Sequence, residues 1–196
     1  MADLKKHMCF PTVVAEFQYE SSVQSKKEML SYVKDRTGFQ QTKDDLHTTS
    51  EFKDFANFIF EINQKHLTEL GYIFDRLDMT GMWANTLQGG EIHQPHTHSN
   101  NFLSGVYYLK TSSRTSPIQF FDPRPQSDVL KPRKKEYNRL NSNIAQFQSE
   151  TGWGVVFPSW LVHWVPETKD ERISIAWNVI VRGEYGEPNT LQNAYI

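Results

Sequence analysis

The chain has 196 residues, 38% of them hydrophobic and 13% aromatic, which is typical of one globular domain with a substantial core and excludes an intrinsically disordered chain. The formal net charge of −2 favours neither nucleic acid nor an anionic membrane as a partner. No stretch approaches the roughly 20 apolar residues of a membrane span, so we expect a cytoplasmic protein of the producing or host cell.

The first third, residues 1–71, is expected to supply one strand and two supporting helices to a single domain that covers residues 1–196. Residues 8–17, MCFPTVVAEF, are apolar and rich in β-branched side chains, which predicts the first strand. The only cysteine, Cys9, excludes an intramolecular disulfide and fits a reducing compartment. Beside Phe10, it is expected to be a small buried residue.

Two helices follow. Ser25 and Glu28 have the spacing of a capping box, and Gly38 is expected to end the first helix. Ser50 is expected to cap the second helix, and Gly71 to close it as a C-terminal glycine. Apolar residues repeat at helical spacing between those two positions, at Phe52, Phe55, Ile59 and Ile62.

From residue 72 to residue 182 the pattern changes to short runs rich in β-branched and aromatic residues, separated by turn-forming residues. No long helical pattern lies between the runs, so parallel βαβ units are not expected. We therefore predict a mainly β core of the jelly-roll class, followed by a tail at residues 183–196. The predicted strands are residues 82–87, 102–110, 118–122, 144–148, 154–158 and 172–181.

One long segment, residues 123–143, interrupts the predicted strands. It contains three prolines and six lysine or arginine residues. The simpler interpretation is a solvated loop, because runs of charge usually face water. The alternative is a flap over a site that recognises an anionic group. The basic residues by themselves favour the first interpretation.

The sequence EIHQPHTHSNN, residues 91–101, places three histidines within six positions. If His96 and His98 lie on a strand, their imidazoles point the same way and can converge on one metal ion. His93 is separated from them by Pro95 and is less suited to that geometry. Such a pair is a weak motif by itself, because chance surface histidines also produce it.

A second group of residues lies downstream. His163 is flanked by apolar residues, and nine positions later Arg172 and Ser174 lie on one face of an alternating strand. The other face of that strand carries Ile173, Ile175, Trp177 and Val179, which we expect to pack against a second sheet. An arginine that faces the interior requires an anion. That anion can be a ligand carboxylate or an acidic residue of another strand.

Taken together, four features resemble the iron(II)/2-oxoglutarate-dependent oxygenases: H-x-H, a strand ending in YYL, FPSW-x-x-H, and R-x-S nine residues beyond. The chain is similar in particular to small single-domain members found in bacteria and phages. The resemblance runs from about residue 83 to residue 181. It implies a double-stranded β-helix, a distorted cupin-like jelly roll with helices outside one sheet. It also implies Fe(II), 2-oxoglutarate and O₂ as cofactor and cosubstrates.

The resemblance also assigns roles to individual residues. His96 and His163 would be iron ligands, and His98 stands where most members have Asp or Glu. Arg172 would hold the distal carboxylate of 2-oxoglutarate. The residues expected to assist Arg172 are Ser174, Tyr108 and Asn85, while Tyr107 would face the core.

A histidine at position 98 changes the expected metal chemistry. The usual non-haem iron site has two histidines and one carboxylate. A third neutral imidazole removes one negative charge, which makes the metal a stronger Lewis acid and also suits zinc, copper or nickel. Asp122, in the sequence FFDP, is the alternative carboxylate ligand, either directly or through water. His93 is a further candidate near the site.

Two other functions remain open from the sequence. One is a cupin-type three-histidine dioxygenase or isomerase without 2-oxoglutarate, in which Arg172 would have no role. The other is a non-enzymatic jelly-roll module with a structural metal, although closed zinc sites normally have four protein ligands. The shared fold does not choose among second substrates, small or macromolecular. No residue pattern indicates the oligomeric state.

Overall fold

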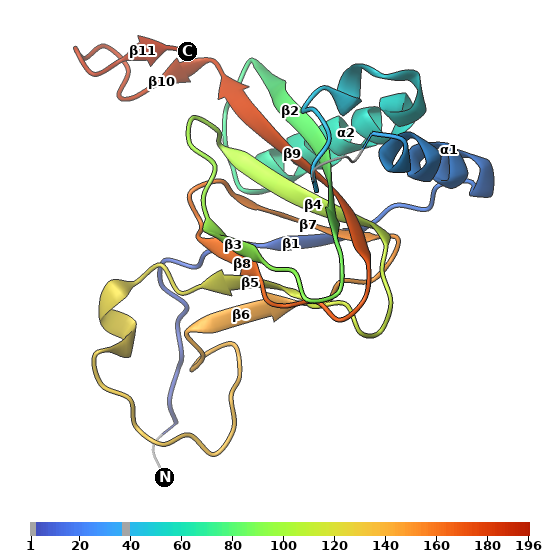
Figure 1. Ribbon diagram of the computed structural model, residues 1–196. Helices are drawn as coiled ribbons and strands as arrows, with labels where there is room; N and C mark the ends of the chain where they lie inside the picture. The colour runs from blue at the N-terminus through green and yellow to red at the C-terminus, as the bar shows by residue number, and fades with distance from the viewer. Residues whose placement is uncertain (1–2, 37–39) are drawn as a thin grey trace.

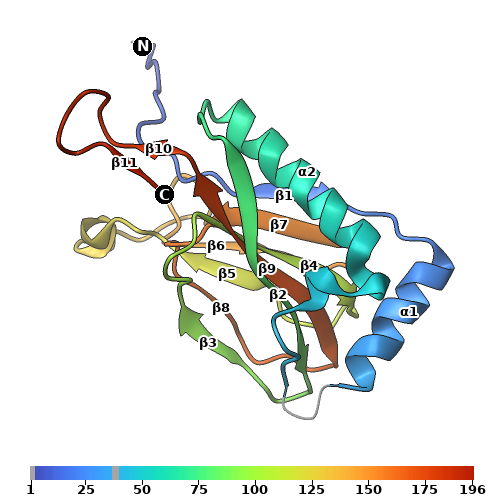
Figure 2. The ribbon, with the colours of Figure 1, turned by 90° about the horizontal axis from the view of Figure 1, so that it is seen from above.

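Two antiparallel sheets face each other, and two helices cover the outer face of the larger sheet (Figures 1 and 2). This computed structural model describes residues 3–36 and 40–196. The larger sheet has the strand order β1 (Ala15–Gln18), β7 (Trp153–Pro158), β4 (Leu103–Lys110), β9 (Arg172–Arg182) and β2 (Arg76–Leu87). The smaller sheet has the order β3 (His93–His96), β8 (His163–Val165), β5 (Ile118–Phe121) and β6 (Ile144–Phe147).

The chain connects these sheets as expected of a jelly roll, so the predicted fold class is confirmed. Neighbouring strands β4 and β7 of the larger sheet are joined through excursions into the smaller sheet, as Figure 1 shows. The helices are α1 (Val23–Lys34) and α2 (Lys53–Glu69), and a small hairpin of β10 (Glu184–Tyr185) and β11 (Ala194–Tyr195) ends the chain. Among the described residues, no helix is both long and apolar enough to cross a membrane.

All six runs predicted to be strands between residues 82 and 181 are strands in the structure. The largest error is at β2, which begins at Arg76, six residues before the predicted start. Strands β3 and β8 were not predicted, because they have only four and three residues and carry no alternating apolar pattern.

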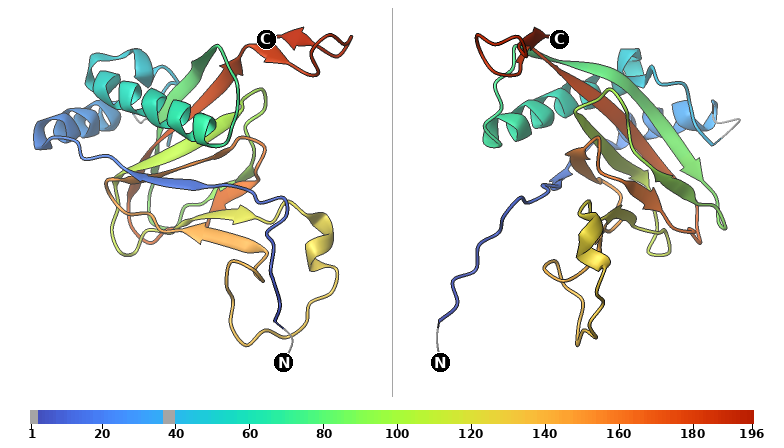
Figure 3. Two further views of the ribbon diagram at one scale, coloured as in Figure 1. Left: turned by 180° about the vertical axis from the view of Figure 1, so that it is seen from behind. Right: turned by 90° about the vertical axis from the view of Figure 1, so that its left-hand side faces the viewer.

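The predicted first strand was wrong in extent and in burial. Only Ala15–Gln18 forms β1, by pairing with β7. The residues before β1 extend away from the sheets (Figure 3), and Cys9 is exposed, whereas we expected it to be buried. Phe10 is 95% exposed. The apolar residues before Ala15 do not pair with a neighbouring strand. Hydrophobicity alone therefore predicted a strand that is too long.

The helix boundaries also needed correction. Ser22, not Ser25, caps α1, and its side chain accepts a hydrogen bond from the Ser25 backbone N–H. The predicted end at Gly38 lies outside the described residues. Ser50 begins a short 3-10 turn that leads into α2 and does not cap it. Gly71 closes α2 in the left-handed conformation, as predicted, with φ of 82°.

The core has two parts, one on each side of the larger sheet. Side chains of β9 such as Ile175 and Trp177 pack with α1 and α2, not against the second sheet as predicted from the sequence. Tyr107 faces this helix side, as expected. The smaller apolar group between the sheets includes Tyr108 and Phe157. The second sheet therefore covers the opposite face of β9, which is the face that carries Arg172 and Ser174.

Residues 122–143 form the long connection between β5 and β6, with one 3-10 turn at Pro125–Asp128. Figures 1 and 3 show this segment extending from the smaller sheet on the side away from the helices. Most of its apolar side chains are exposed, including Leu130 at 85% and Tyr137 at 75%. This exposure agrees with the solvated loop that we preferred.

Candidate metal and cosubstrate site

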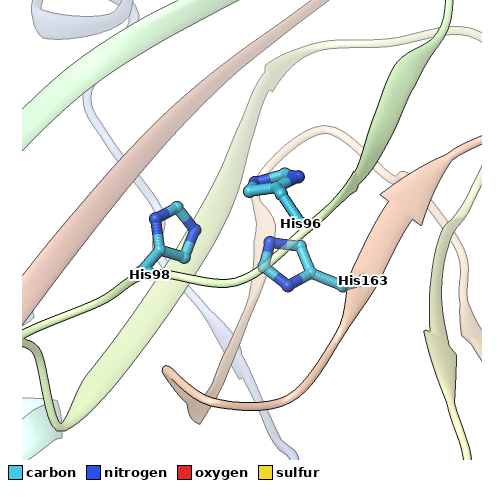
Figure 4. A group of neighbouring side chains, drawn as sticks. All are labelled: His96, His98 and His163. Atoms are coloured by element: carbon cyan, nitrogen blue, oxygen red, sulfur yellow. The ribbon is translucent and has the colours of Figure 1, made fainter.

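Three histidines converge at one end of the smaller sheet. His96 ends β3, His98 lies in the turn that follows, and His163 begins β8. One ring nitrogen from each histidine lies within 4.8 Å of the others. Figure 4 shows the three rings pointing toward a common centre. The residues that the HxH and FPSW-x-x-H patterns suggested are therefore brought together, although they are 67 positions apart at the extremes.

Strand pairing fixes this geometry. His96 and His163 are direct partners in the antiparallel pair β3–β8, and their ring centroids lie 4.3 Å apart. His98 is beyond the end of β3, so the alternation of a strand does not orient its ring. It is held instead by its backbone N–H, which donates to the Ser159 carbonyl oxygen at 2.9 Å. Its ring centroid lies 5.2 Å from that of His163.

Two of the three rings are aimed by backbone carbonyl oxygens. Nδ1 of His96 lies 2.8 Å from the Gln94 carbonyl oxygen, and Nδ1 of His163 lies 2.9 Å from the Leu161 carbonyl oxygen. A carbonyl only accepts hydrogen bonds, so in each neutral ring Nδ1 carries the proton and Nε2 is left with a free lone pair. Metal-binding histidines are commonly oriented in this way.

Burial keeps the rings of His98 and His163 neutral, which is the form that binds metals. It lowers the pKa of His163 to about 3. The hydrogen bond to the Leu161 carbonyl oxygen raises this pKa in part, and the nearby histidines lower it further. Burial also lowers the pKa of His98 to about 4. Phe157 and Phe120 pack against His163 at ring distances of 4.6 and 5.9 Å. His98 and His163 therefore offer neutral imidazoles, and His163 lies among apolar rings.

The two remaining ligand candidates lie differently. His93 stacks on His96 with ring centroids 4.5 Å apart, and burial lowers its pKa to about 4, but it is not one of the three converging residues. Asp122 forms a two-pronged ion pair with Arg124, at 2.9 and 2.7 Å. Among the described residues, no carboxylate joins the histidine cluster. The structure therefore places Asp122 in an ion pair with an exposed arginine, outside the histidine cluster.

The residues predicted to hold 2-oxoglutarate form a row across the larger sheet. Ser174 of β9 pairs with Asn85 of β2 on one side and with Tyr108 of β4 on the other. All three are buried. Directly opposed residues of antiparallel strands point to the same face, and here that face looks toward the smaller sheet. Strand register thus collects in one row residues that are far apart in the sequence.

Arg172 lies two residues before Ser174 on β9 and is only 2% exposed. Its guanidinium donates to the Ser174 hydroxyl at 2.8 Å and lies over the Tyr108 ring, 4.9 Å from the ring centroid. Its Nε and the Tyr108 hydroxyl have no hydrogen-bond partner. Among residues 3–36 and 40–196, no carboxylate pairs with it. Burial accordingly lowers the pKa of Arg172, and raises that of Tyr108.

A narrow cavity connects these groups. It has a volume of about 30 Å³, which is the space of roughly one water molecule. A dicarboxylate needs more room than this, and Arg172 and Ser174 are among the residues that line the cavity. The residues around the cavity include Trp83, Asn85, His93, His96, His98, His163, Arg172 and Ser174. A larger cavity of about 320 Å³, lined by Lys34, Thr86 and Glu171 among others, contains no histidine.

Sequence reasoning missed one part of the site. Asn178 belongs to the inward-facing set of β9, and its side-chain amide reaches Nδ1 of His98 at 3.5 Å. The buried hydroxyls of Ser104 and Ser159 lie behind it. The alternation on β9 marked Asn178 as inward-facing. The contact of Asn178 with His98 was not predictable, because the turn after β3 sets the position of that ring.

Known structures share this fold. A prolyl-4-hydroxylase from Pseudomonas putida superposes with a TM-score of 0.60 and 13% identity, covering 88% of this chain and 89% of that chain. A viral collagen prolyl hydroxylase from Paramecium bursaria Chlorella virus-1, in complex with 2-oxoglutarate, superposes with a TM-score of 0.57 and 11% identity, covering 85% of this chain and 94% of that chain. HygX from Streptomyces hygroscopicus, with nickel and 2-oxoglutarate bound, superposes with a TM-score of 0.55 and 10% identity, covering 86% of this chain and 81% of that chain.

At the level of sequence, no curated protein matches the chain. The profile of the family described as "Putative 2OG-Fe(II) oxygenase" matches residues 81–178, which is half of the chain. The matched segment contains the three converging histidines and Arg172. The predicted metal and cosubstrates, Fe(II), 2-oxoglutarate and O₂, are those of this family. The chain therefore belongs to the 2-oxoglutarate/Fe(II)-dependent oxygenases.

Proposed function

We propose that the protein is an oxygenase that couples oxidative decarboxylation of 2-oxoglutarate to hydroxylation of a second substrate. In this reaction one oxygen atom of O₂ enters a substrate C–H bond and the other enters succinate, with release of CO₂. Bound Fe(II) supplies the activation of O₂. His96, His98 and His163 are the proposed ligands, and Arg172 is the proposed anchor for the distal carboxylate of 2-oxoglutarate.

The observation that carries this proposal is the unpaired buried charge of Arg172. A guanidinium removed from water is costly unless an anion meets it, and the described residues supply none. A ligand carboxylate can accept the free Nε–H and one further N–H in the two-pronged geometry that arginine favours. The Tyr108 hydroxyl, also without a partner, is available to the same ligand.

The donor set of the metal site supports the same ligand. Three neutral imidazoles leave the full charge of a divalent metal in the site, whereas a carboxylate ligand would cancel one unit of it. A dianionic cosubstrate is therefore attracted both by the metal site and by Arg172. Phe157 and Phe120 keep water from His163, and lower local polarity strengthens these electrostatic interactions.

The two alternatives make different demands. A three-histidine enzyme of the cupin type has no use for an unpaired Arg172 beside the metal. A structural metal site normally closes with a fourth protein ligand, and among the described residues only His96, His98 and His163 converge. Both alternatives therefore leave Arg172 unexplained.

The test is an anaerobic titration of metal-free protein with Fe(II) and then with 2-oxoglutarate, followed by visible absorption. We expect a charge-transfer band only when both are present. Arg172→Leu should keep its iron affinity and bind 2-oxoglutarate at least about 100-fold more weakly, since two charged hydrogen bonds are lost. His163→Ala should lose iron. The matched control is Arg133→Leu, which removes an exposed arginine of the connection between β5 and β6 and should change neither affinity.

Other outcomes would contradict the proposal in distinct ways. Iron binding without a band would favour the three-histidine enzyme that does not use 2-oxoglutarate. Absence of iron binding would favour the non-enzymatic module. An unchanged affinity of Arg172→Leu for 2-oxoglutarate would remove Arg172 from the carboxylate site.

A further inference from the structure

The third histidine is held differently from the other two. Nδ1 of His96 and of His163 faces a backbone carbonyl oxygen, which can only accept a proton. Nδ1 of His98 faces the side-chain amide of Asn178 instead. An amide has an oxygen that accepts and a nitrogen that donates, so it can satisfy either tautomer of the ring. The tautomer of His98 therefore depends on which way this amide points.

A buried row of side chains determines that orientation. The Ser104 hydroxyl lies 2.7 Å from Oδ1 of Asn178 and 2.8 Å from the Ser159 hydroxyl. Ser104 and Ser159 are at most 1% exposed, and Asn178 is 9% exposed. Water therefore cannot replace a missing partner readily, and each proton in the row has to match the next acceptor.

Counting protons along the row gives two self-consistent states. In the first, Ser159 donates to Ser104, Ser104 donates to Oδ1 of Asn178, and Nδ2 of Asn178 donates to Nδ1 of His98. Nε2 of His98 then carries the ring proton, so this nitrogen has no lone pair for a metal. This is the direction in which the side chains lie in the structure. The contact of 3.5 Å to His98 is long for a hydrogen bond.

The second state is the reverse. A half-turn of the Asn178 amide exchanges its oxygen and nitrogen with little movement of other atoms. Nδ1–H of His98 then donates to Oδ1, Nδ2 donates to Ser104, and Ser104 donates to Ser159. Each group of the row again has a hydrogen-bond partner, with Ser159 now accepting from Ser104 and its own proton directed out of the row. Nε2 of His98 now has a free lone pair, as Nε2 of His96 and His163 already has.

We propose that Asn178 is a positioning residue whose amide selects the tautomer of His98, and that the row Ser159–Ser104–Asn178–His98 reverses when metal binds through Nε2. The inference rests on the proposed role of His98 as a metal ligand. Nε2 of His96 and of His163 has a free lone pair before and after the reversal, whereas Nε2 of His98 has one only after it. The strand that carries Arg172 thus also controls the third ligand, because Asn178 lies on β9 as well.

The test is ¹⁵N NMR of histidine side chains, which distinguishes protonated from unprotonated ring nitrogens, at pH 8 and without metal. We expect the Nε2–H tautomer for His98 and the Nδ1–H tautomer for His96 and His163. Addition of Zn(II) alone should convert His98 to the Nδ1–H form. Asn178→Asp, which only accepts, should show the Nδ1–H form of His98 before any metal is added.

Two further variants separate tautomer control from charge and from folding. Asn178→Leu keeps the volume but removes the partner, so both tautomers of His98 should be populated and Zn(II) affinity should fall by about 10-fold or more. Asn101→Asp is the control for added charge near the turn and should leave the His98 tautomer unchanged. A metal-free His98 already in the Nδ1–H form, or a tautomer insensitive to both Asn178 variants, would overturn the inference.

These readouts do not depend on the proposed reaction. In one outcome, the His98 tautomer changes in the Asn178 variants while the protein shows no charge-transfer band with Fe(II) and 2-oxoglutarate. That result would support this inference and contradict the proposed function. A normal band in a protein whose His98 tautomer ignores Asn178 would do the opposite.

Discussion

On the side of β9 that faces the helices, Ile175 and Trp177 are fully buried among apolar side chains. The other side of the same strand carries Arg172, Ser174 and Asn178, which are nearly as buried but polar. Trp177 packs against Phe17 and Phe55 at ring distances of 5.9 and 6.2 Å. Arg172 has a free Nε and no anion.

The helix-facing side of β9 mainly stabilises the fold, whereas the inner side carries the polar groups of the candidate site. The helix-facing side is closely packed: a side chain at Gly105 of β4 would overlap the Trp177 ring, so only glycine fits there. The inner side keeps unsatisfied donors in a small cavity, which costs stability and leaves groups ready for a ligand. Because alternate residues of one strand point to opposite faces, a short sequence can specify both.

The largest effect should come from breaking the helix-facing side. Trp177→Ala removes the largest fully buried side chain of the protein, and we expect it to lower the free energy of unfolding by about 3–5 kcal/mol. Urea unfolding followed by circular dichroism measures this. Trp160→Ala is the matched control, since Trp160 is 57% exposed, and should cost less than about 0.5 kcal/mol. Similar losses for the two variants would refute this view of the core.

A smaller effect should come from protonating the inner side. Folding lowers the pKa of His93 and His98 to about 4 and of His163 to about 3, so the unfolded chain binds protons first as the pH falls. Stability of the metal-free protein should therefore be complete above about pH 6.5 and decrease below it. Each ring should contribute a loss of about 1–2 kcal/mol between pH 7 and pH 5.

His93→Gln checks this expectation without removing a proposed ligand. Urea unfolding at both pH values should show a smaller pH dependence for this variant than for the native protein. His7→Gln, in the exposed N-terminal segment, is the control and should keep the native dependence. A native protein equally stable at pH 7 and pH 5 would mean that the rings are hydrated in the folded state.

Patterns within single strands made much of the molecule predictable. The alternation in β9 identified Arg172 and Ser174 as inward-facing residues, and the Gly71 cap of α2 followed from local chemistry. Cross-strand register was less accessible. That Ser174 would lie between Asn85 and Tyr108 depends on how β2, β9 and β4 align, and hydrogen bonding across the sheet fixes that alignment only in the folded chain.

The errors have a common physical origin in tertiary context. Phe10 and Cys9 looked like a buried strand because they are apolar, yet no neighbouring strand pairs with them in the structure. Asp122 was only the alternative carboxylate ligand, and in the structure Arg124, two residues away, holds it in an ion pair. The Asn178–His98 contact depends on the turn after β3, which lies outside any strand, so no periodic pattern in the sequence predicted it.

The smallest effect should be the most informative about the inner side. Without ligands, Arg172 is a buried charge with one hydrogen bond to Ser174, so Arg172→Leu should leave the free energy of unfolding unchanged or raise it by about 1 kcal/mol. Arg182→Leu removes another arginine of β9, which forms a partly exposed ion pair with Asp78 of β2, and should lower the free energy of unfolding by up to about 1 kcal/mol. Urea unfolding of both metal-free variants gives the comparison. A loss above about 2 kcal/mol for Arg172→Leu would show that the guanidinium already stabilises the fold, and the buried arginine would then no longer indicate a missing carboxylate.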